Sequence, residues 1–338
     1  MTEPAPSFSK IKTLYDMYYG FRPNKPTFLP EEYPDLTGKT AIVTGCNTGI
    51  GYFVMKLLYS KNCNVIAVVR TESKGIEARE KVLEEIKESS GSISVVGGCD
   101  LLDMTSIKSA AEKVKQTLGD KPLNIIIHNA GLMSSFNDGV SKQGIEAMFS
   151  TNVMGPQLLQ HFLDPLFLKK DSDFKRIVWV SSVAHLVGFP QYGINWENPG
   201  FINEPLDKRP AYWTLYGQSK AANILQAKAW YTKNQKIADE IGCVSVSCYP
   251  GNLKSELSRD FGTISKFVIM SVCWDVIYGA YSELYAALSP DLTTKDQGAY
   301  VVPFGEVQDP RNDLKVGLTN GTDLKLFNMV EDMIKDYF

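Results

Sequence analysis

The chain has 338 residues, of which 44% are hydrophobic and 22% are charged, the ordinary composition of a globular protein. Its net charge of −3 predicts no nucleic-acid surface. Six cysteines without a CxxC pair argue for a reducing compartment, and three histidines without an HxxxH spacing argue against a metal site.

No signal peptide or membrane span is expected. The most apolar string, FVIMSVCW at 267–274, is shorter than the ~18 apolar residues that a span needs. We therefore expect a cytoplasmic protein. Peripheral association with a membrane or lipid droplet is the alternative, because this string could meet lipid instead of forming a buried helix.

Residues 1–38 are predicted to form an irregular N-terminal extension, because five prolines lie between Pro4 and Pro30 and another follows at Pro34. Seven apolar runs then alternate with segments that suit helices. The runs are typical of strands buried on both faces, which predicts a parallel sheet with helices on both sides. They are TAIVTG, NVIAVV, SISVVGG, LNIIIH, RIVWVS, VSVSCY and AYVVPF.

The predicted fold class is α/β, with a single Rossmann-type doubly wound domain and a parallel sheet of about seven strands. We expect this domain to cover residues 39–310. It would include an insertion at 188–213 and an apolar segment at 256–297. A C-terminal segment, 311–338, would follow it.

The string TGCNTGIG, Thr44 to Gly51, lies between the first predicted strand and a helix. Glycine permits a tight turn in which backbone N–H groups approach a pyrophosphate, and the helix N-terminus adds partial positive charge. A plain tight turn is the alternative. The predicted cofactor contacts of this turn are Gly45, Asn47, Thr48, Gly49, Ile50 and Gly51.

The glycine spacing G-x-x-x-G-x-G resembles that of the short-chain dehydrogenase/reductase family, and the resemblance extends from about residue 36 to 305. Its motifs follow in the family's order as HNAG, STNVMG, VSS, a Tyr-x-x-x-Lys pair and PG. The resemblance implies a catalytic tetrad of Asn152, Ser182, Tyr216 and Lys220. It also implies cofactor contacts at Tyr216, Lys220, Asp100, Leu101, Asn129, Ala130, Gly131, Pro250, Gly251, Leu253 and Ser255.

The Tyr-x-x-x-Lys spacing occurs twice, at Tyr52 and Lys56 and again at Tyr216 and Lys220. The first pair lies on the helix that leaves the glycine turn, where no substrate is expected. The second pair follows the fifth strand, near the carboxyl end of the sheet where open α/β folds bind ligands. Residues four apart on a helix share a face, so one ligand can touch both members of the pair.

The second strand ends at Arg70, nineteen residues after Gly51 (70 − 51). An acidic residue at this place accepts a ribose 2′-OH, whereas an arginine accommodates a 2′-phosphate. Glu72 comes two residues later and does not occupy the strand end. We therefore expect NADP(H) in preference to NAD(H).

The expected chemistry is proton transfer by Tyr216 to or from a carbonyl or alcohol oxygen. A phenol has a pKa of ~10, and we expect Lys220, helped by the positively charged oxidised nicotinamide, to lower it. The resemblance implies that Ser182 holds the substrate oxygen and that Asn152 anchors a water; bonding of Asn152 to neighbouring backbone is the alternative. His185 could point into the active site, whereas His128 is more simply a structural residue.

Ser182 and Tyr216 are 34 residues apart (216 − 182), farther than in most short-chain reductases. We interpret the insertion 188–213 as a wall of the substrate pocket, since it holds four prolines and six aromatic residues. With SSVAH and YVVPFGEV, it most resembles the retinol dehydrogenase-like branch and fungal light-induced alcohol dehydrogenase-type proteins.

The family uses the region of 256–297 as a substrate lid, and its aromatic and aliphatic residues indicate an apolar carbonyl or alcohol substrate. The alternatives are packing on the sheet or a homodimer contact.

Three other functions are alternatives that the sequence disfavours. One is a non-catalytic nucleotide sensor or scaffold, which would not need the tetrad. Another is a sugar epimerase, whose glycine spacing differs. The last is a Ser-His-Asp hydrolase, which the missing G-x-S-x-G elbow disfavours.

Overall fold

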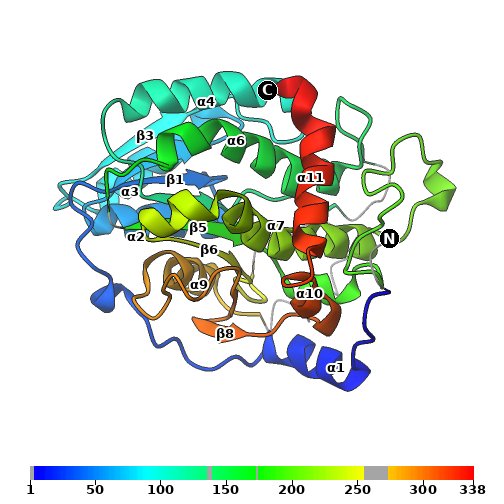
Figure 1. Cartoon of the computed structure of the whole chain (residues 1–338). Coiled ribbons are helices and arrows are strands. Elements are labelled where there is room, and N and C mark those ends of the chain that lie inside the picture. Colours follow the sequence, from blue (N-terminus) through cyan, green and yellow to red (C-terminus); the bar gives the residue numbers. More distant parts are fainter. Residues whose placement is uncertain (1–3, 135–138, 173, 255–272) are drawn as a thin grey trace.

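The computed structural model describes residues 4–134, 139–172, 174–254 and 273–338, shown in colour in Figure 1. In this part of the chain one sheet has the order β3-β2-β1-β4-β5-β6-β7-β8, and neighbouring strands are parallel up to β7. The predicted doubly wound α/β fold is therefore confirmed. The strands are β1 Thr40–Thr44, β2 Asn64–Val68, β3 Ser92–Val96, β4 Ile125–His128, β5 Lys175–Val180, β6 Cys243–Cys248, β7 Tyr300–Val302 and β8 Glu306–Gln308.

Seven of these strands lie within the predicted apolar runs or start one residue before them, but the predicted number of strands was one too few. The additional strand, β8, pairs antiparallel with β7 through Val301 and Val307. It has only three residues, and Val307 is 46% exposed. A short edge strand without a buried apolar run carries little sequence signal.

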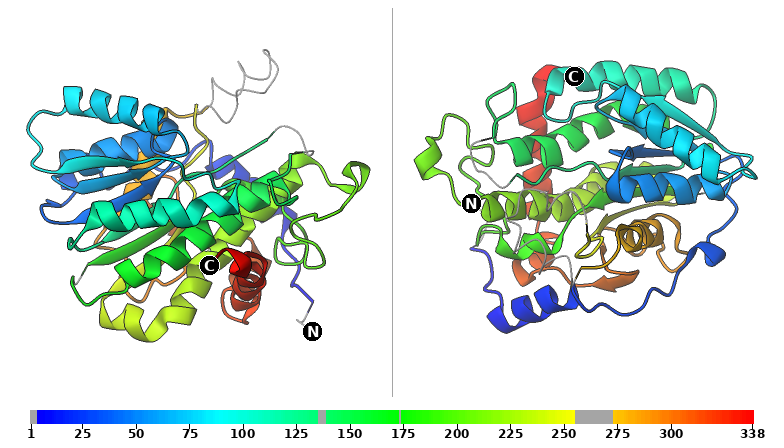
Figure 2. Two further views of the ribbon diagram at one scale, coloured as in Figure 1. Left: turned by 90° about the horizontal axis from the view of Figure 1, so that it is seen from above. Right: turned by 180° about the vertical axis from the view of Figure 1, so that it is seen from behind.

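Helices cover both faces of the sheet, as Figure 2 shows. Successive strand residues alternate between the two cores: Ile126 belongs to one buried cluster and Ile127 to the other. One core includes α4 Met104–Leu118, α6 Gly155–Phe167 and α7 Tyr212–Glu240. The other includes α2 Gly49–Ser60, α3 Glu72–Glu85 and α9 Val276–Leu288.

The predicted irregularity of the N-terminal extension was wrong for residues 10–19, which form helix α1, Lys10–Tyr19. The Ser9 hydroxyl accepts a hydrogen bond from Lys12 N at 3.3 Å, as an N-cap does. The prolines lie outside the helix and bound the extension without preventing a helix between them. A 3₁₀ turn, Pro30–Glu32, then precedes β1.

The predicted substrate lid, 256–297, is in part a core helix. Residues 276–288 form α9, which packs against α2 and against β5 on the sheet. Gly279 permits the close approach, because a Cβ there would lie 2.4 Å from Leu253. The alternative that this segment packs on the sheet therefore holds for α9. Residues 255–272 lie outside the described part of the chain.

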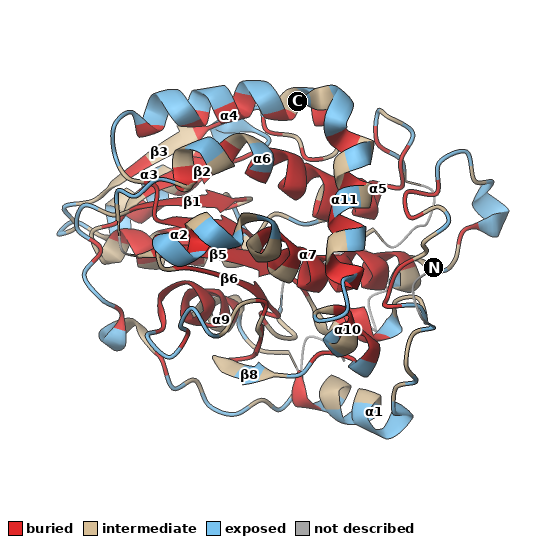
Figure 3. Ribbon diagram, viewed as in Figure 1, coloured by how far each residue is buried: buried red, intermediate tan, exposed pale blue. Residues whose placement is uncertain are grey.

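The C-terminal segment forms α10 Asn312–Gly317 and α11 Thr322–Ile334, followed by a 3₁₀ turn at Lys335–Tyr337. Leu326, Val330 and Ile334 of α11 are buried in the same core as α6 and α7, and Figure 3 shows this inner face as buried. Within the described ranges, no helix is long and apolar enough to cross a membrane.

Candidate active site

Tyr216 and Lys220 lie side by side near the start of α7, and both are buried. The Lys220 Nζ atom lies 5.5 Å from the centre of the Tyr216 ring. It donates hydrogen bonds to Val180 O at 2.9 Å and to Asn223 Oδ1 at 3.4 Å. The Ser181 hydroxyl donates to Lys220 O at 2.7 Å, so this part of α7 is attached to the carboxyl end of β5.

Ser182 follows β5 and caps the 3₁₀ helix Val183–Val187, where its hydroxyl accepts from Ala184 N at 3.2 Å. A hydrogen bond with Ser182 lowers the pKa of Tyr216, but burial outweighs it and raises that pKa to about 12. The chain alone thus raises this pKa, whereas the lowering that we predicted included the charge of the oxidised nicotinamide. The physical reason is that the phenol is removed from water, while the Lys220 ammonium group donates its hydrogen bonds to Val180 O and Asn223 Oδ1 and not to the phenol.

A buried carboxyl group, Glu283 of α9, acts on Lys220 electrostatically and was missed by the sequence analysis. Burial lowers the pKa of Lys220 to about 8, and the charge of Glu283 opposes this change. Burial raises the pKa of Glu283 to about 8. Neither carboxyl oxygen has a hydrogen-bond partner among the described residues. The only sequence signal was a carboxylate within the apolar run SELYAAL.

Asn152 lies in a π-helical turn, Ser150–Met154, a distortion often found at functional sites. Its Nδ2 donates to Leu132 O and to Ser219 Oγ, both at 2.9 Å, and its Oδ1 accepts from Leu132 N at 2.7 Å. Its backbone carbonyl accepts from Asn223 Nδ2 at 2.7 Å. The side chain bonds the backbone of Leu132 as the alternative expected, and the anchoring of a water by Asn152 stays a prediction. Asn223 links this turn to Lys220.

An apolar cluster surrounds the Tyr216 ring. Part of the cluster comes from the predicted insertion 188–213, which agrees with its interpretation as a pocket wall without testing it. The buried members are Met148, Ala184, Phe201, Leu215 and Tyr216, and the half-buried members are Leu132, Met133, Phe189 and Tyr212.

The glycine turn fits a dinucleotide phosphate. Gly45 and Gly49 have φ angles of 68° and 62°, which glycine adopts at little cost. A Cβ at Gly51 would lie 2.8 Å from Gly45 O and 2.4 Å from Asn129 Nδ2, so the turn closes too tightly for a side chain. Thr48 caps α2 without a side-chain hydrogen bond, which leaves the first N–H groups of the helix for an anion. Asn47 and Ile50 are half-buried in the same turn.

The turn after β4 is attached to the glycine turn. Asn129 Nδ2 donates to Thr44 O at 2.7 Å, and Ala130 N donates to Thr44 Oγ1 at 2.9 Å. These bonds hold the two turns at the same end of the sheet, because β1 and β4 are parallel neighbours.

The same turn continues to the predicted catalytic residues. A Cβ at Gly131 would lie 3.4 Å from Asn152 Oδ1 and 3.5 Å from Lys220 Nζ, so this glycine lies beside the tetrad. His128 is buried below the turn, with its Nε2 2.9 Å from Gln160 Oε1, and burial lowers its pKa to about 4. The structural interpretation of His128 agrees with this position.

The remaining predicted cofactor residues lie at strand ends. Arg70 is exposed just after β2. Asp100 follows β3, and its Oδ1 accepts from Leu102 N at 3.1 Å. Leu101 is buried against Gly155, whose Cβ position lies 2.8 Å from it.

After β6, Pro250 is buried and Gly251 has a φ of 119°. Leu253 forms a β-bridge with Trp274. Ser255 lies outside the described residues. The cofactor contacts as a set stay a prediction.

The first Tyr-x-x-x-Lys pair, Tyr52 and Lys56, is separate from this site. Tyr52 Oη donates to Glu85 Oε1 at 3.3 Å, and Lys56 forms an ion pair with the same carboxylate. Both therefore belong to a surface contact between α2 and α3.

A hollow of about 510 Å³ lies away from the Tyr216 site, among residues that include Lys12, Tyr300 and Lys315.

His185 does not point into the active site, so that alternative was wrong. Its Nδ1 lies 2.8 Å from Ser182 O and its Nε2 accepts from Arg311 N at 3.2 Å. Tyr300 Oη lies 3.3 Å from Nδ1, and burial lowers the pKa of the ring to about 3. His185 thus connects the Ser182 turn to the start of α10.

The described cysteines are free thiols, and no group of His, Cys, Asp or Glu in the described ranges could hold a metal ion. Cys46 is buried in the glycine turn, where burial raises its thiol pKa to about 12.

A doubly wound sheet that carries a glycine turn and a buried Tyr-Lys pair at its carboxyl end defines a Rossmann-type oxidoreductase. The family model for short chain dehydrogenase matches residues 39–194. The chain is 35% identical to the short-chain dehydrogenase/reductase bet4 of Neocamarosporium betae, over 92% of this chain and 90% of that protein. It is 35% identical to sthC of Phaeosphaeria nodorum, over 82% and 87%. The chain belongs to the short-chain dehydrogenase/reductase family.

Solved structures agree with this assignment. A protein from Mycobacterium paratuberculosis superposes with a TM-score of 0.66 at 25% identity, covering 90% of this chain and 97% of that one. A short chain dehydrogenase/reductase family protein has a TM-score of 0.56 at 20% identity, which shows the fold alone. Proteins of this family use NAD(H) or NADP(H) and act on small molecules.

Proposed function

We propose that this protein interconverts an apolar aldehyde or ketone and its alcohol with NADP(H), using Tyr216 as the general acid and base. The observation that carries the proposal is the position of the Tyr216 phenol. It lies inside an apolar cluster and beside Lys220, at the carboxyl end of the sheet. An apolar wall around a proton donor suits an apolar substrate more than a charged one.

The cofactor, when bound, supplies or accepts the hydride. The substrate oxygen would accept hydrogen bonds from the Ser182 and Tyr216 hydroxyls, and Tyr216 would give it a proton as the alkoxide develops. A phenol with a pKa near 12 is protonated at neutral pH, so it suits the donor role. Lys220 would restore the proton of Tyr216, since a lysine pKa near 8 allows proton exchange near neutral pH.

NADP(H) is favoured over NAD(H) because the exposed Arg70 lies at the end of β2, where a 2′-phosphate would lie. A reducing, cytoplasmic location belongs to the proposal because the described cysteines are free thiols. The resemblance to the retinol dehydrogenase-like branch supports an apolar substrate. A homodimer stays a prediction.

The proposal is tested by following nicotinamide absorbance with aldehydes, ketones and alcohols of increasing apolar length. Tyr216→Phe should lower kcat by about 10²–10⁴-fold, the usual contribution of one general acid, and should leave NADPH binding intact by fluorescence titration.

Tyr52→Phe is the matched control, because it removes a tyrosine hydroxyl with the same spacing to a lysine. It should retain full activity. Turnover by Tyr216→Phe at the wild-type rate would refute the role of Tyr216. Tight NADPH binding without turnover of any substrate would instead favour a nucleotide sensor.

A further inference from the structure

Helix α1 presents a stripe of large apolar side chains to solvent. Ile11, Leu14, Tyr15 and Tyr18 are 81%, 67%, 60% and 64% exposed. Their spacing of i, i+3, i+4 and i+7 places them on one face of the helix. Single exposed apolar residues are common, but four on one face of a ten-residue helix form an unpartnered apolar face.

The carboxyl-terminal end of the helix is attached to the protein. Tyr19 is buried, and its hydroxyl donates to Glu306 Oε2 at 2.6 Å and lies 3.0 Å from Pro303 O. Gly20 follows, and a Cβ there would lie 2.2 Å from Tyr249 Oη. The stripe is therefore held outward by specific contacts and is not the free face of a loose tail.

Basic residues outnumber acidic ones in the segment that carries the stripe, where Lys12 pairs with Asp16 at 2.6 Å. Residues 9–25 contain Lys10, Lys12, Arg22 and Lys25 but only one acidic residue, Asp16, so their net charge is +3 (4 − 1). The whole chain has a net charge of −3. A second copy of this face would meet the same positive charge, which disfavours a symmetric dimer here. Apolar side chains flanked by cations fit a surface of anionic lipid.

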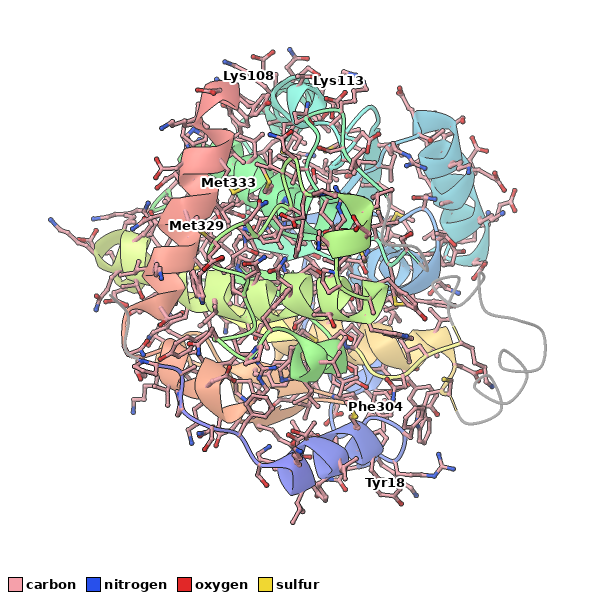
Figure 4. The ribbon with its side chains drawn as sticks, turned by 90° about the vertical axis from the view of Figure 1, so that its right-hand side faces the viewer. Tyr18, Lys108, Lys113, Phe304, Met329 and Met333 are labelled. Carbon is pink, nitrogen blue, oxygen red and sulfur yellow. The ribbon has the colours of Figure 1, made fainter. Side chains whose placement is uncertain are left out.

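We propose that α1 docks the protein on anionic membrane surfaces, with Ile11, Leu14, Tyr15 and Tyr18 entering the headgroup region. Figure 4 shows Tyr18 and Phe304 at the same end of the molecule. The Cβ position of Gly20 lies 2.2 Å from Tyr249 Oη and 3.0 Å from Asn252 Nδ2, which places the end of the helix beside the turn after β6. The docked face would thus lie next to the proposed cofactor site. This inference does not depend on the proposed catalysis.

The test is sedimentation of the full-length protein with sucrose-loaded vesicles of phosphatidylcholine containing 30% phosphatidylserine. We expect the wild type to sediment with these vesicles, and less with phosphatidylcholine alone. The double variant Ile11→Glu, Leu14→Glu should bind at least about tenfold more weakly, because burial of two aliphatic side chains is lost.

Lys115→Glu is the matched control, because this exposed lysine on α4 changes the net charge by the same two units as the double variant. It should bind like the wild type. Equal losses in both variants, or no vesicle binding by the wild type, would overturn the proposal. So would a dimer in sedimentation velocity that the double variant abolishes while vesicle binding is unchanged. NADPH fluorescence should be the same for all three proteins and shows that they are folded.

Discussion

At the scale of single residues, Arg70 carries the proposed choice between the two cofactors. It is exposed at the end of β2, and a 2′-phosphate would gain a charge-assisted hydrogen bond there. Losing such a bond costs about 1.5–3 kcal/mol. Arg70→Ala should therefore raise the KM for NADPH by about 10–100-fold and leave the KM for NADH nearly unchanged.

Steady-state kinetics with both cofactors check this prediction. Lys74→Ala is the control, since it removes an exposed positive charge on α3, one turn into the helix that follows Arg70. Equal effects of Arg70→Ala on both cofactors would contradict a 2′-phosphate contact.

Residue types and spacing predicted a candidate tetrad, but not all of the surroundings of its members. The structure brings Tyr216 and Lys220 together as the helical spacing predicts. Asn223 was missed because its role depends on hydrogen bonds that reach the Asn152 turn. Glu283 was missed because its charge acts on Lys220 from α9, a helix far away in the sequence. Burial raises the pKa of Tyr216 in the chain without cofactor, and the sequence could not predict this because burial depends on the packing of segments that are far apart in sequence.

At the scale of elements, Arg311 connects three segments around Ser182. Its guanidinium donates to Leu186 O at 3.1 Å, Gly188 O at 3.0 Å and Phe189 O at 2.5 Å, and it pairs with Asp313 at 2.7 Å. The side chain is 1% exposed. The start of α10 thereby closes the 3₁₀ helix after Ser182 and the beginning of the insertion.

Arg311→Ala should lower the free energy of unfolding by about 3–5 kcal/mol, because it leaves a buried carboxylate and three carbonyls without their partner. Urea denaturation followed by tryptophan fluorescence measures this loss. Lys315→Ala, which breaks an exposed pair with Asp309, should change stability by less than about 1 kcal/mol. Similar losses in the two variants would contradict the role of Arg311.

At the scale of the whole molecule, the alternation of apolar strands and helices was enough to predict the doubly wound sheet. The two cores explain why, since a strand buried on both faces must be apolar at nearly every position. Elements at the rim were predicted less well. Helix α1 and strand β8 are short and half-exposed, and each is stabilised by the other through Tyr19 and Glu306.

Glu283 makes the stability of the whole molecule depend on pH. Its pKa rises from 4.5 in the unfolded chain to about 8 in the folded protein. Between these values the folded state keeps a proton that the unfolded state has released. Stability therefore falls as pH rises from 4.5 to 8 and is unaffected by this group outside that window. The loss at pH 7 is on the order of 3 kcal/mol.

Glu283→Gln removes this titration while keeping the shape of the side chain. The variant should be similar to the wild type at pH 5 and progressively more stable than it at pH 6, 7 and 8. Urea denaturation at each pH measures the difference in free energy of unfolding between the two proteins. The titration of other buried groups, such as Asp164, contributes equally to both proteins and does not affect this difference.

Glu84→Gln, at an exposed position on α3, is the control and should give a curve of stability against pH that is parallel to that of the wild type. Parallel curves for Glu283→Gln as well would mean that Glu283 is ionised in the folded protein at neutral pH. The positive charge of Lys220 would then stabilise the Glu283 carboxylate, and the loss of this Lys220–Glu283 interaction in the variant should also change the pH dependence of turnover.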